Sequence, residues 1–214
     1  MTDSRDLILG RIRSALVGVD RAEHPANEPV ARDYHDSHTD TGLANLLARN
    51  LTDYRAHVHR AAEAELPGLI GRLLAARGAR TLAVPPGLPT DWLPGDSGTR
   101  ILHDDGTLTA TELDRVDSVL TGCAVAIAET GTLVLDAGPD QGRRMLTLVP
   151  DHHICVVRTG DQIVASVPQA LRRLDPERPQ TWISGPSATS DIELNRVEGV
   201  HGPRTLDVVL IAEG

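Results

Sequence analysis

Lysine and phenylalanine are absent from this chain, and tryptophan and tyrosine occur only twice each in its 214 residues. All 21 basic residues are therefore arginine, which excludes a Schiff-base lysine, a pyridoxal phosphate anchor and the lysine of a phosphate-binding P-loop. The shortage of aromatic rings disfavours stacking platforms for single-stranded nucleic acid. A net charge of −9 at pH 7 also disfavours a general binder of nucleic acid or anionic membranes.

Cysteine is scarce as well, because Cys123 and Cys155 are the only two. They form no CxxC motif, so this chain alone cannot supply four cysteine ligands to an iron–sulfur or zinc site. No apolar run is long enough to cross a membrane, and the first residues carry charges through their apolar stretch, unlike a signal peptide. We therefore expect a cytoplasmic protein with no membrane span.

Histidine offers no convincing metal site. His57 and His59 fall in a segment with helical spacing, where positions two apart face different directions and cannot share one metal ion. The other pairs, His35 with His38 and the adjacent His152-His153, lack companion ligands. We expect this chain to bind no metal and no cofactor of its own.

The chain divides into residues 1–42 and residues 43–214. Apolar residues at helical spacing predict an amphipathic helix over 3–17. Residues 18–42 hold glycine, proline, aspartate and histidine but little apolar content, which predicts an extended linker arm. A helix beyond such a linker docks on a partner subunit or on its own core, and the pattern does not separate the two.

The pattern over residues 43–214 predicts an α/β domain. Its spacing predicts helical structure over 43–77, restarted at Pro67 and closed by Gly78, and further helices around 111–118 and 167–174. Short apolar runs predict strands at 81–84, 100–103, 124–128, 132–135, 153–157, 181–184 and 206–211. Strands interleaved with helices indicate a mainly parallel sheet covered on both faces.

The first candidate site is the short link between two apolar runs, Glu129-Thr130-Gly131-Thr132. So short a link predicts a hairpin or a bent strand. Burying an unpaired carboxylate is costly, so Glu129 is expected to face a pocket or solvent, while Gly131 allows close approach of a ligand. Thr130 and Thr132 offer hydroxyl groups. The alternative is a turn glutamate that caps backbone amides.

The second candidate is the loop over 138–144, Gly-Pro-Asp-Gln-Gly-Arg-Arg. Two glycines around a polar turn and two following arginines suit a carboxylate or phosphate, with Arg143 or Arg144 as the clamp. The alternative is an ordinary strand-to-helix loop with solvated arginines. The glycine spacing does not match the dinucleotide-binding fingerprint.

The third candidate is the loop over 185–193, which directly follows an expected strand. If that strand is parallel, its carboxyl end is where open α/β sheets bind ligands. Its candidate binding residues are Gly185, Ser187, Asp191 and Glu193. The alternative is that a serine in this loop caps a helix.

The fourth candidate is His201, held between glycines in the segment over 199–203. An imidazole in an exposed loop can act as a general acid or base, or bind an anion. The alternative is a loop histidine without a chemical role.

Three segments together resemble the LUD-domain family. They are Gly122–Leu135 around Glu129, Ile183–Ser187 with Asp191–Glu193 following, and Gly199–Pro203 before the last expected strand. The resemblance runs from about Leu43 to Ile211. It implies a LUD domain over 43–214, with a three-layer α/β fold similar to the NagB/RpiA/CoA-transferase group and N-terminal helices added.

The resemblance also implies a function in lactate utilization. It implies a role in oxidising L-lactate to pyruvate beside two iron–sulfur partner proteins, LutA-like and LutB-like, with this chain as the cluster-free subunit. From the candidate sites above, we expect Glu129 and His201 to be catalytic. A small carboxylate substrate would be bound by Thr130, Gly131, Thr132, Arg143, Gly185, Ser187, Asp191 and Glu193.

Two other functions remain open. One is a stand-alone enzyme of the same fold group, either a CoA transferase with Glu129 as nucleophile or a sugar-phosphate isomerase with Glu129 as base. The other is a scaffold or regulatory binding protein without catalysis. Fold-level analogy does not decide between them, because function depends on the site.

Overall fold

A computed structural model describes residues 4–17, 35–95, 98–189, 197–198 and 202–212. The chain forms two compact units, Met1–His35 and Asp36–Gly214. The first contains α1 (Ser4–Ala15), as the apolar spacing predicted, and its Leu7, Ile8 and Ile12 side chains are exposed. No helix among the described residues is both long and apolar enough to cross a bilayer.

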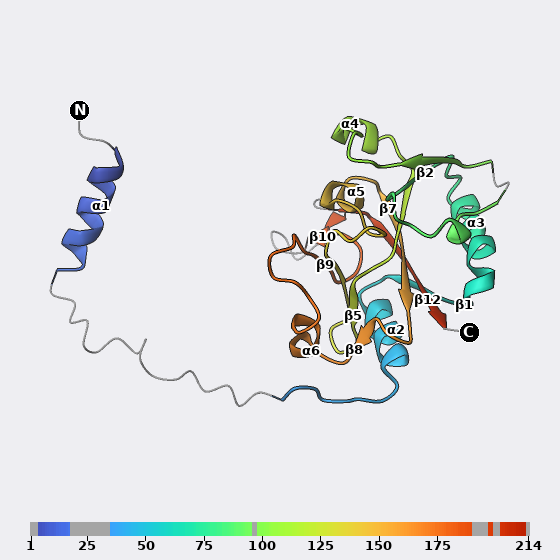
Figure 1. The fold of residues 1–214 in the computed structure, drawn as a ribbon, viewed down its shortest axis with the longest axis horizontal. Coiled ribbons are helices and arrows are strands. Elements are labelled where there is room, and N and C mark those ends of the chain that lie inside the picture. Colours follow the sequence, from blue (N-terminus) through green and yellow to red (C-terminus); the bar gives the residue numbers. More distant parts are fainter. Residues whose placement is uncertain (1–3, 18–34, 96–97, 190–196, 199–201, 213–214) are drawn as a thin grey trace. The chain divides into compact units, whose positions relative to one another are not determined.

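A six-stranded parallel sheet forms the centre of the second unit, in the order β1-β12-β7-β4-β2-β3 (Figure 1). Its strands are β1 (His57–Ala62), β2 (Thr81–Val84), β3 (Arg100–His103), β4 (Ser118–Thr121), β7 (His152–Arg158) and β12 (Thr205–Ala212). In β2, Leu82 and Val84 pack on one side of the sheet and Ala83 on the other. Both faces are therefore apolar and covered, as predicted.

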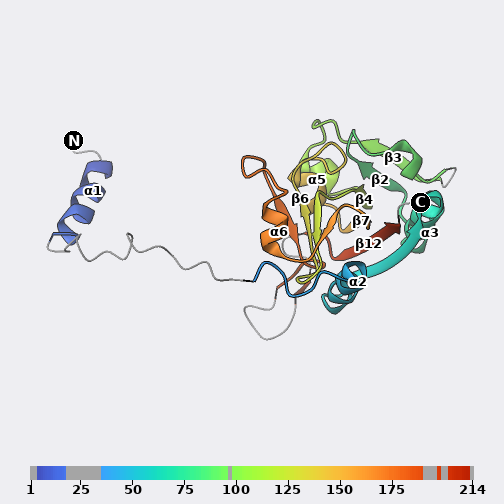
Figure 2. The same cartoon turned by 60° about the horizontal axis from the view of Figure 1, so that its bottom comes forward.

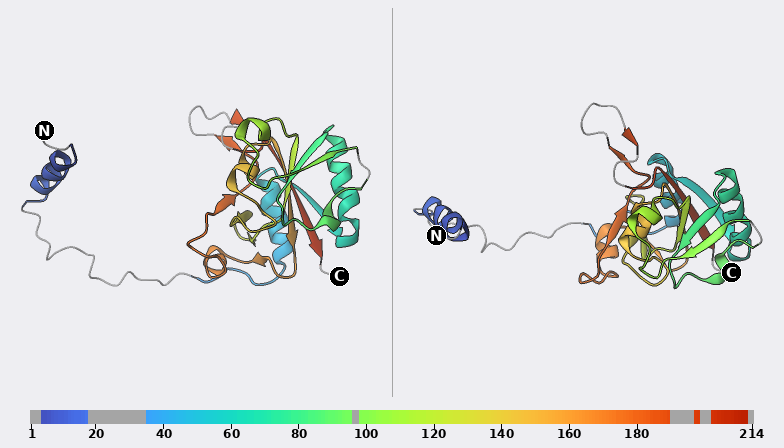
Figure 3. Two further views of the ribbon diagram at one scale, coloured as in Figure 1. Left: turned by 45° about the horizontal axis from the view of Figure 1, so that its top comes forward. Right: turned by 90° about the horizontal axis from the view of Figure 1, so that it is seen from above.

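Helices and a smaller sheet make the outer layers. One face of the main sheet packs against α3 (Leu66–Ala76), and the other against α2 (Leu43–Asp53) and the smaller sheet (Figure 3). The short helices α4 (Ala110–Leu113) and α5 (Arg144–Leu148) extend this second cover. The result is the predicted three-layer α/β fold.

The smaller sheet has the order β8-β5-β6-β9. Its strands are β5 (Val125–Ile127), β6 (Thr132–Leu135), β8 (Ile163–Val164) and β9 (Thr181–Ile183). β5 and β6 pair antiparallel, which confirms the hairpin, and α6 (Val167–Leu171) covers the outer side of this sheet (Figure 2). The remaining short elements are η3 (Glu63–Glu65), η4 (Thr90–Trp92), β10 (Ala188–Thr189) and β11 (Val197–Glu198).

The helical structure predicted over 43–77 is wrong in its middle, because strand β1 separates α2 from α3. Arg55 has a positive φ of 68°, and the Ala56 N–H bonds back to the Leu51 carbonyl at 2.9 Å, which ends α2. The two ends of the prediction are confirmed. Pro67 lies in the first turn of α3, and Gly78 follows the helix with a φ of 64°.

The strand also corrects the placement of His57 and His59. Positions two apart in a strand share one face, so both rings approach the same carboxylate, that of Asp207, at 3.6 and 2.6 Å. Among the residues that the structure describes, no group of three or more His, Cys, Asp or Glu side chains is arranged to hold a metal ion.

Candidate functional site

The turn that carries Glu129 is fixed to helix α2. Asn50 Nδ2 donates to the carbonyl oxygens of Ala128 at 2.7 Å and Glu129 at 3.0 Å. Gly131 has a φ of 59°, and a Cβ there would lie 2.9 Å from the backbone carbon of Asn50. Only glycine satisfies both the backbone conformation and the close approach of the helix.

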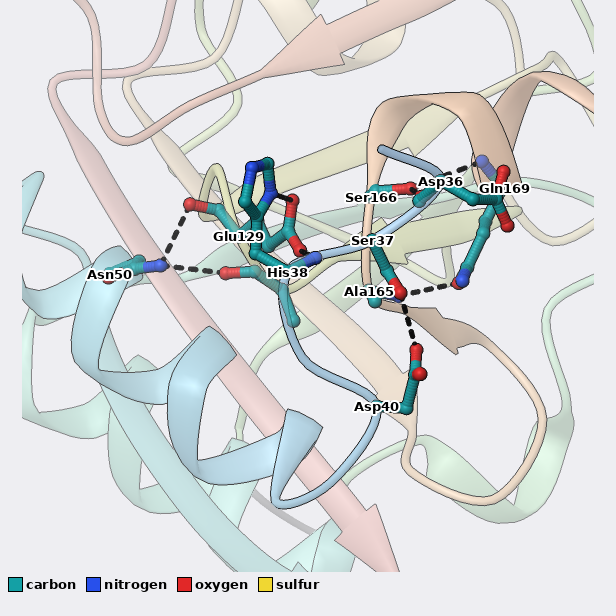
Figure 4. Close-up of polar contacts among 10 residues, drawn as sticks. Asp36, Ser37, His38, Asp40, Asn50, Glu129, Ala165, Ser166 and Gln169 are labelled. Carbon is teal, nitrogen blue, oxygen red and sulfur yellow. Dashed lines mark hydrogen bonds and ion pairs between the residues drawn. The ribbon is translucent and has the colours of Figure 1, made fainter. Parts of the chain in front are cut away.

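The carboxylate of Glu129 is held by a segment far away in the sequence. Its Oε1 accepts the His38 backbone N–H at 2.6 Å, and its Oε2 lies 3.3 Å from the His38 Nδ1 (Figure 4). The backbone hydrogen bond from His38 is the main cause that lowers the pKa of Glu129, so the side chain is ionised at neutral pH. Glu129 thus caps a backbone amide, as the alternative interpretation of this turn anticipated.

The segment over 36–40 is itself anchored beside α6. Ser166 Oγ donates to the Asp36 carbonyl, and Arg172 forms an ion pair with the Asp36 carboxylate. Ser37 Oγ donates to Asp40 at 2.7 Å (Figure 4). These residues fall within the expected linker arm, yet they pack on the α/β unit next to Glu129.

A pocket of about 320 Å³ opens beside the turn, lined by Asn50, Asp53, Tyr54, Glu129 and Thr130. Two of these residues are acidic and none is basic. A bound carboxylate would therefore meet like charge without a compensating cation. The described lining favours a neutral or cationic group over an anion such as lactate.

A chain of hydroxyl groups links this turn to strand β9. Thr130 Oγ1 lies 2.8 Å from Thr132 Oγ1, which in turn lies 2.8 Å from Ser184 Oγ. The structure therefore brings two sequence candidates, Thr130 and Thr132, next to the loop that holds Gly185 and Ser187.

That loop borders a second pocket, of about 250 Å³, between α5, β7, β9 and β12. Gly185 and Ser187 both line it. Gly185 has a φ of 84°, and a Cβ there would lie 2.6 Å from the Tyr54 carbonyl oxygen. The second pocket is lined by Thr147, Leu148, His153, Thr181, Trp182, Ile183, Ser184, Gly185, Pro186, Ser187, Gly202, Pro203 and Leu206.

Two expectations about this loop need correction. β9 pairs antiparallel with β6, so the loop does not follow a parallel strand. Ser187 does not cap a helix either, because strand β10 follows it directly. The ligand-binding argument for this loop therefore rests on the pocket and not on the carboxyl end of a parallel strand.

Arg143 lies apart from both pockets. Its guanidinium donates to both oxygens of buried Asp104, at 2.8 and 2.9 Å, and also to the Leu108 carbonyl. The hydrogen bond to Asp104 raises the pKa of Arg143. Asp104 therefore engages this arginine, and Arg143 is not among the residues that line either pocket.

The other candidates, Asp191, Glu193 and His201, lie outside the described residues, so their roles stay sequence predictions.

Sequence reasoning missed His153 as a pocket residue. It is fully buried in β7, and its Nε2 lies 2.8 Å from Thr121 Oγ1. Burial lowers its pKa to about 3, so the ring is neutral at neutral pH. The only sequence feature that concerned His153 was its position in an apolar strand run, and this feature predicts a buried residue without a binding role.

A second polar network was also missed, at the amino ends of the central strands. Asp207 accepts hydrogen bonds from His59 and His152 at 2.6 and 2.9 Å, and Ser118 Oγ lies 2.7 Å from His152 Nδ1. Ser118 and His152 are 0 and 1% exposed, and the Ser118 hydroxyl is engaged by His152. The network joins strands and does not form a hydrolytic site.

The comparisons with known proteins agree with the fold. A model of the LUD domain matches residues 44–211. A protein named lactate utilization protein C from Deinococcus radiodurans is 53% identical over 165 residues, which are 75% of this chain and 76% of that protein. Another from an Exiguobacterium species is 34% identical over 151 residues, 65% of each chain. The crystal structure of a DUF162 family protein from Deinococcus radiodurans matches with a TM-score of 0.67 and 42% identity, over 79% of this chain and 96% of that one.

Proposed function

The chain belongs to the LUD-domain family, and from this premise we propose that it serves lactate utilization as the cluster-free subunit of an L-lactate-oxidising complex. The observation that carries the proposal is the 53% identity to a lactate utilization protein C over three quarters of the chain. Proteins this similar usually keep the same biological role, whereas the fold alone would not support one.

The chemistry of lactate oxidation explains the need for partners. Conversion of lactate to pyruvate removes two electrons and two protons, and amino-acid side chains do not accept the electron pair. We assign the acceptor to iron–sulfur partner proteins, LutA-like and LutB-like. The two cysteines of this chain, without a CxxC motif, fit a subunit that carries no cluster and binds no cofactor.

Within the complex, we propose that Glu129 acts as a proton acceptor or as a polar contact for the partner assembly. The carboxylate is ionised and 19% exposed at the edge of the pocket. The described pocket residues include no cation that would clamp lactate, and Arg143 is engaged by Asp104. This chain therefore contributes to the complex without binding the lactate carboxylate at the Glu129 pocket.

Growth on L-lactate as sole carbon source tests this proposal. A deletion strain of the source bacterium is complemented with wild type, Glu129→Gln or Glu177→Gln, the last removing the same charge at an exposed loop position. We expect deletion to stop growth, Glu177→Gln to restore it, and Glu129→Gln to fail at normal protein level. Full growth of the deletion strain would overturn the pathway, and rescue by Glu129→Gln would leave a scaffold role.

One observation favours a second candidate function, acyl transfer. An ionised carboxylate in a glycine-containing turn beside a pocket has the charge state of a nucleophile that attacks a thioester. Attack on an acyl-CoA would form a mixed anhydride on Glu129 and release the CoA thiolate. Mass spectrometry of the intact chain with acetyl-CoA decides: an acetyl adduct absent from Glu129→Gln supports acyl transfer, and its absence supports the first proposal.

A further inference from the structure

The pocket between α5, β7, β9 and β12 reaches a buried imidazole that lacks one hydrogen bond. His153 lines this pocket, and its Nε2 is paired with Thr121. Its Nδ1 has no hydrogen-bond partner among the residues that the structure describes. Buried polar atoms without a partner are rare, because the lost hydration is not replaced. This atom therefore marks a position that a bound group can complete.

The described residues that line the pocket carry no charge at neutral pH. They are aliphatic, aromatic, glycine, proline and hydroxyl residues apart from His153, whose pKa is lowered to about 3 by burial. A carboxylate or an ammonium group would lose its hydration there without gaining an opposite charge. The described lining thus favours an uncharged ligand over lactate.

The size and walls of the pocket restrict the ligand further. Its volume of about 250 Å³ lies below the roughly 300–1,000 Å³ of pockets that hold drug-sized molecules. The residues that line it include Trp182, whose side chain is 40% exposed, and the ring-bearing Pro186 and Pro203. One planar ring fits these dimensions, and a nucleotide does not.

We propose that this pocket binds an uncharged aromatic ring bearing an amide, with the amide hydrogen-bonded to Nδ1 of His153. The Thr121 hydroxyl either donates to Nε2 or accepts from it, so Nδ1 is correspondingly a donor or an acceptor. A primary amide offers both an N–H and a carbonyl oxygen and matches either state. This site lies apart from the Glu129 pocket and goes beyond the proposed role in lactate oxidation.

Benzamide and benzoate form the matched pair of probes, because they share ring and size and differ in charge. The full-length chain with ¹⁵N-labelled histidine and tryptophan is titrated with each, and the resonances of His153 Nδ1 and Trp182 Nε1 are followed by NMR. We expect saturable shifts at both nuclei with benzamide and at least tenfold weaker binding of benzoate. L-lactate should shift neither resonance.

A variant that fills the pocket tests its location. A Cβ on Gly202 would lie 3.7 Å from Leu148 and Ser187, an ordinary contact, so Gly202→Val is accommodated while its methyl groups take the space of the ligand. Gly95→Val is the control, because a Cβ there meets no atom within 4 Å. We expect Gly202→Val to weaken benzamide binding at least tenfold and Gly95→Val to leave it unchanged.

Three results would overturn the proposal: no saturable shift with benzamide, equal binding of benzoate, or full binding by folded Gly202→Val. Circular dichroism and thermal unfolding establish that the variants are folded. If Gly202→Val does not fold, the comparison of benzamide with benzoate binding to the wild-type chain is the test of the proposal. None of these outcomes depends on growth on lactate, so a negative result for this site would not contradict the proposed function, and the reverse also holds.

Discussion

At the scale of single residues, His38 acts on Glu129 through both its backbone and its imidazole. The backbone N–H lies 2.6 Å from the carboxylate, and this hydrogen bond is the largest single cause that acts on the pKa of Glu129. The His38 imidazole lowers the same pKa through a side-chain hydrogen bond and through its charge.

Two substitutions separate these contributions. His38→Pro removes both the N–H donor and the imidazole, whereas His38→Ala removes only the imidazole, so the difference between the two variants isolates the N–H. We expect the pKa of Glu129 to rise toward its ordinary value in His38→Pro and to rise less in His38→Ala, as measured by ¹³C NMR titration of the carboxyl groups. The pKa of Glu112, lowered by hydrogen bonds from Thr109, serves as an internal control that neither variant changes. Equal shifts of Glu129 in both variants would contradict the assignment.

The sequence predicted the turn at Glu129 but not the partner of its side chain. The hairpin follows from two apolar runs with a glycine between them, which is local information. His38 lies 91 positions earlier, in a polar segment whose composition indicates only a linker. Arg143 shows the same limit, because nothing in the loop over 138–144 reveals that Asp104 binds its guanidinium.

At the scale of elements, the β5–β6 hairpin is positioned by the close contact of its turn with α2. Gly131→Ala would add a Cβ 2.9 Å from the Asn50 backbone at a φ of 59°, whereas Gly98→Ala meets open space at a φ of 70°. Both variants carry the backbone strain, but only the first adds a clash. We expect Gly131→Ala to lose about 1–3 kcal/mol more unfolding free energy than Gly98→Ala in urea titrations. Equal losses would show that the contact with α2 does not fix the turn.

Strand β1 shows why element type was harder to predict than fold class. In the sequence, Val58 continues the apolar spacing of residues 43–54 closely enough to suggest helix. In the structure, His57–Ala62 are a mixture of exposed and half-buried residues. What makes them a strand is parallel pairing with β12, in which His57 lies opposite Asp207. Pairing with a strand this distant in the sequence cannot be predicted from residues 57–62 alone, because strand preference depends on the neighbours that the strand packs against.

At the scale of the whole molecule, Asp207 joins four strands of the main sheet. It binds His59 of β1 and His152 of β7, and His152 continues to Ser118 of β4. Burial alone would raise the pKa of Asp207, but the hydrogen bonds from His152 and His59 hold it well below the usual range. The ionised carboxylate is therefore the form that the folded protein prefers.

Asp207→Asn should lower the unfolding free energy at pH 7 by about 3 kcal/mol, because a buried charged hydrogen-bond acceptor is lost. Asp151→Asn is the matched control: its ion pair with Arg204 is exposed, and its loss should cost less than about 1 kcal/mol. The stabilisation by Asp207 is complete above the ordinary aspartate pKa of about 4 and is lost as the pH falls below it. Urea unfolding at pH 7 and at pH 3 should show the difference between wild type and Asp207→Asn shrinking; a constant difference would refute the linkage.

The strand order has a consequence for how the chain is made. β1 is the first strand of the main sheet to leave the ribosome, and its neighbour in the sheet, β12, is the last. Until residues 205–212 have been synthesised, β1 and β7 each present an unpaired edge to solvent or to a chaperone. The six-stranded sheet can therefore be completed only after β12 has been synthesised. A nascent chain interrupted before that point exposes two strand edges that can pair with other chains and aggregate.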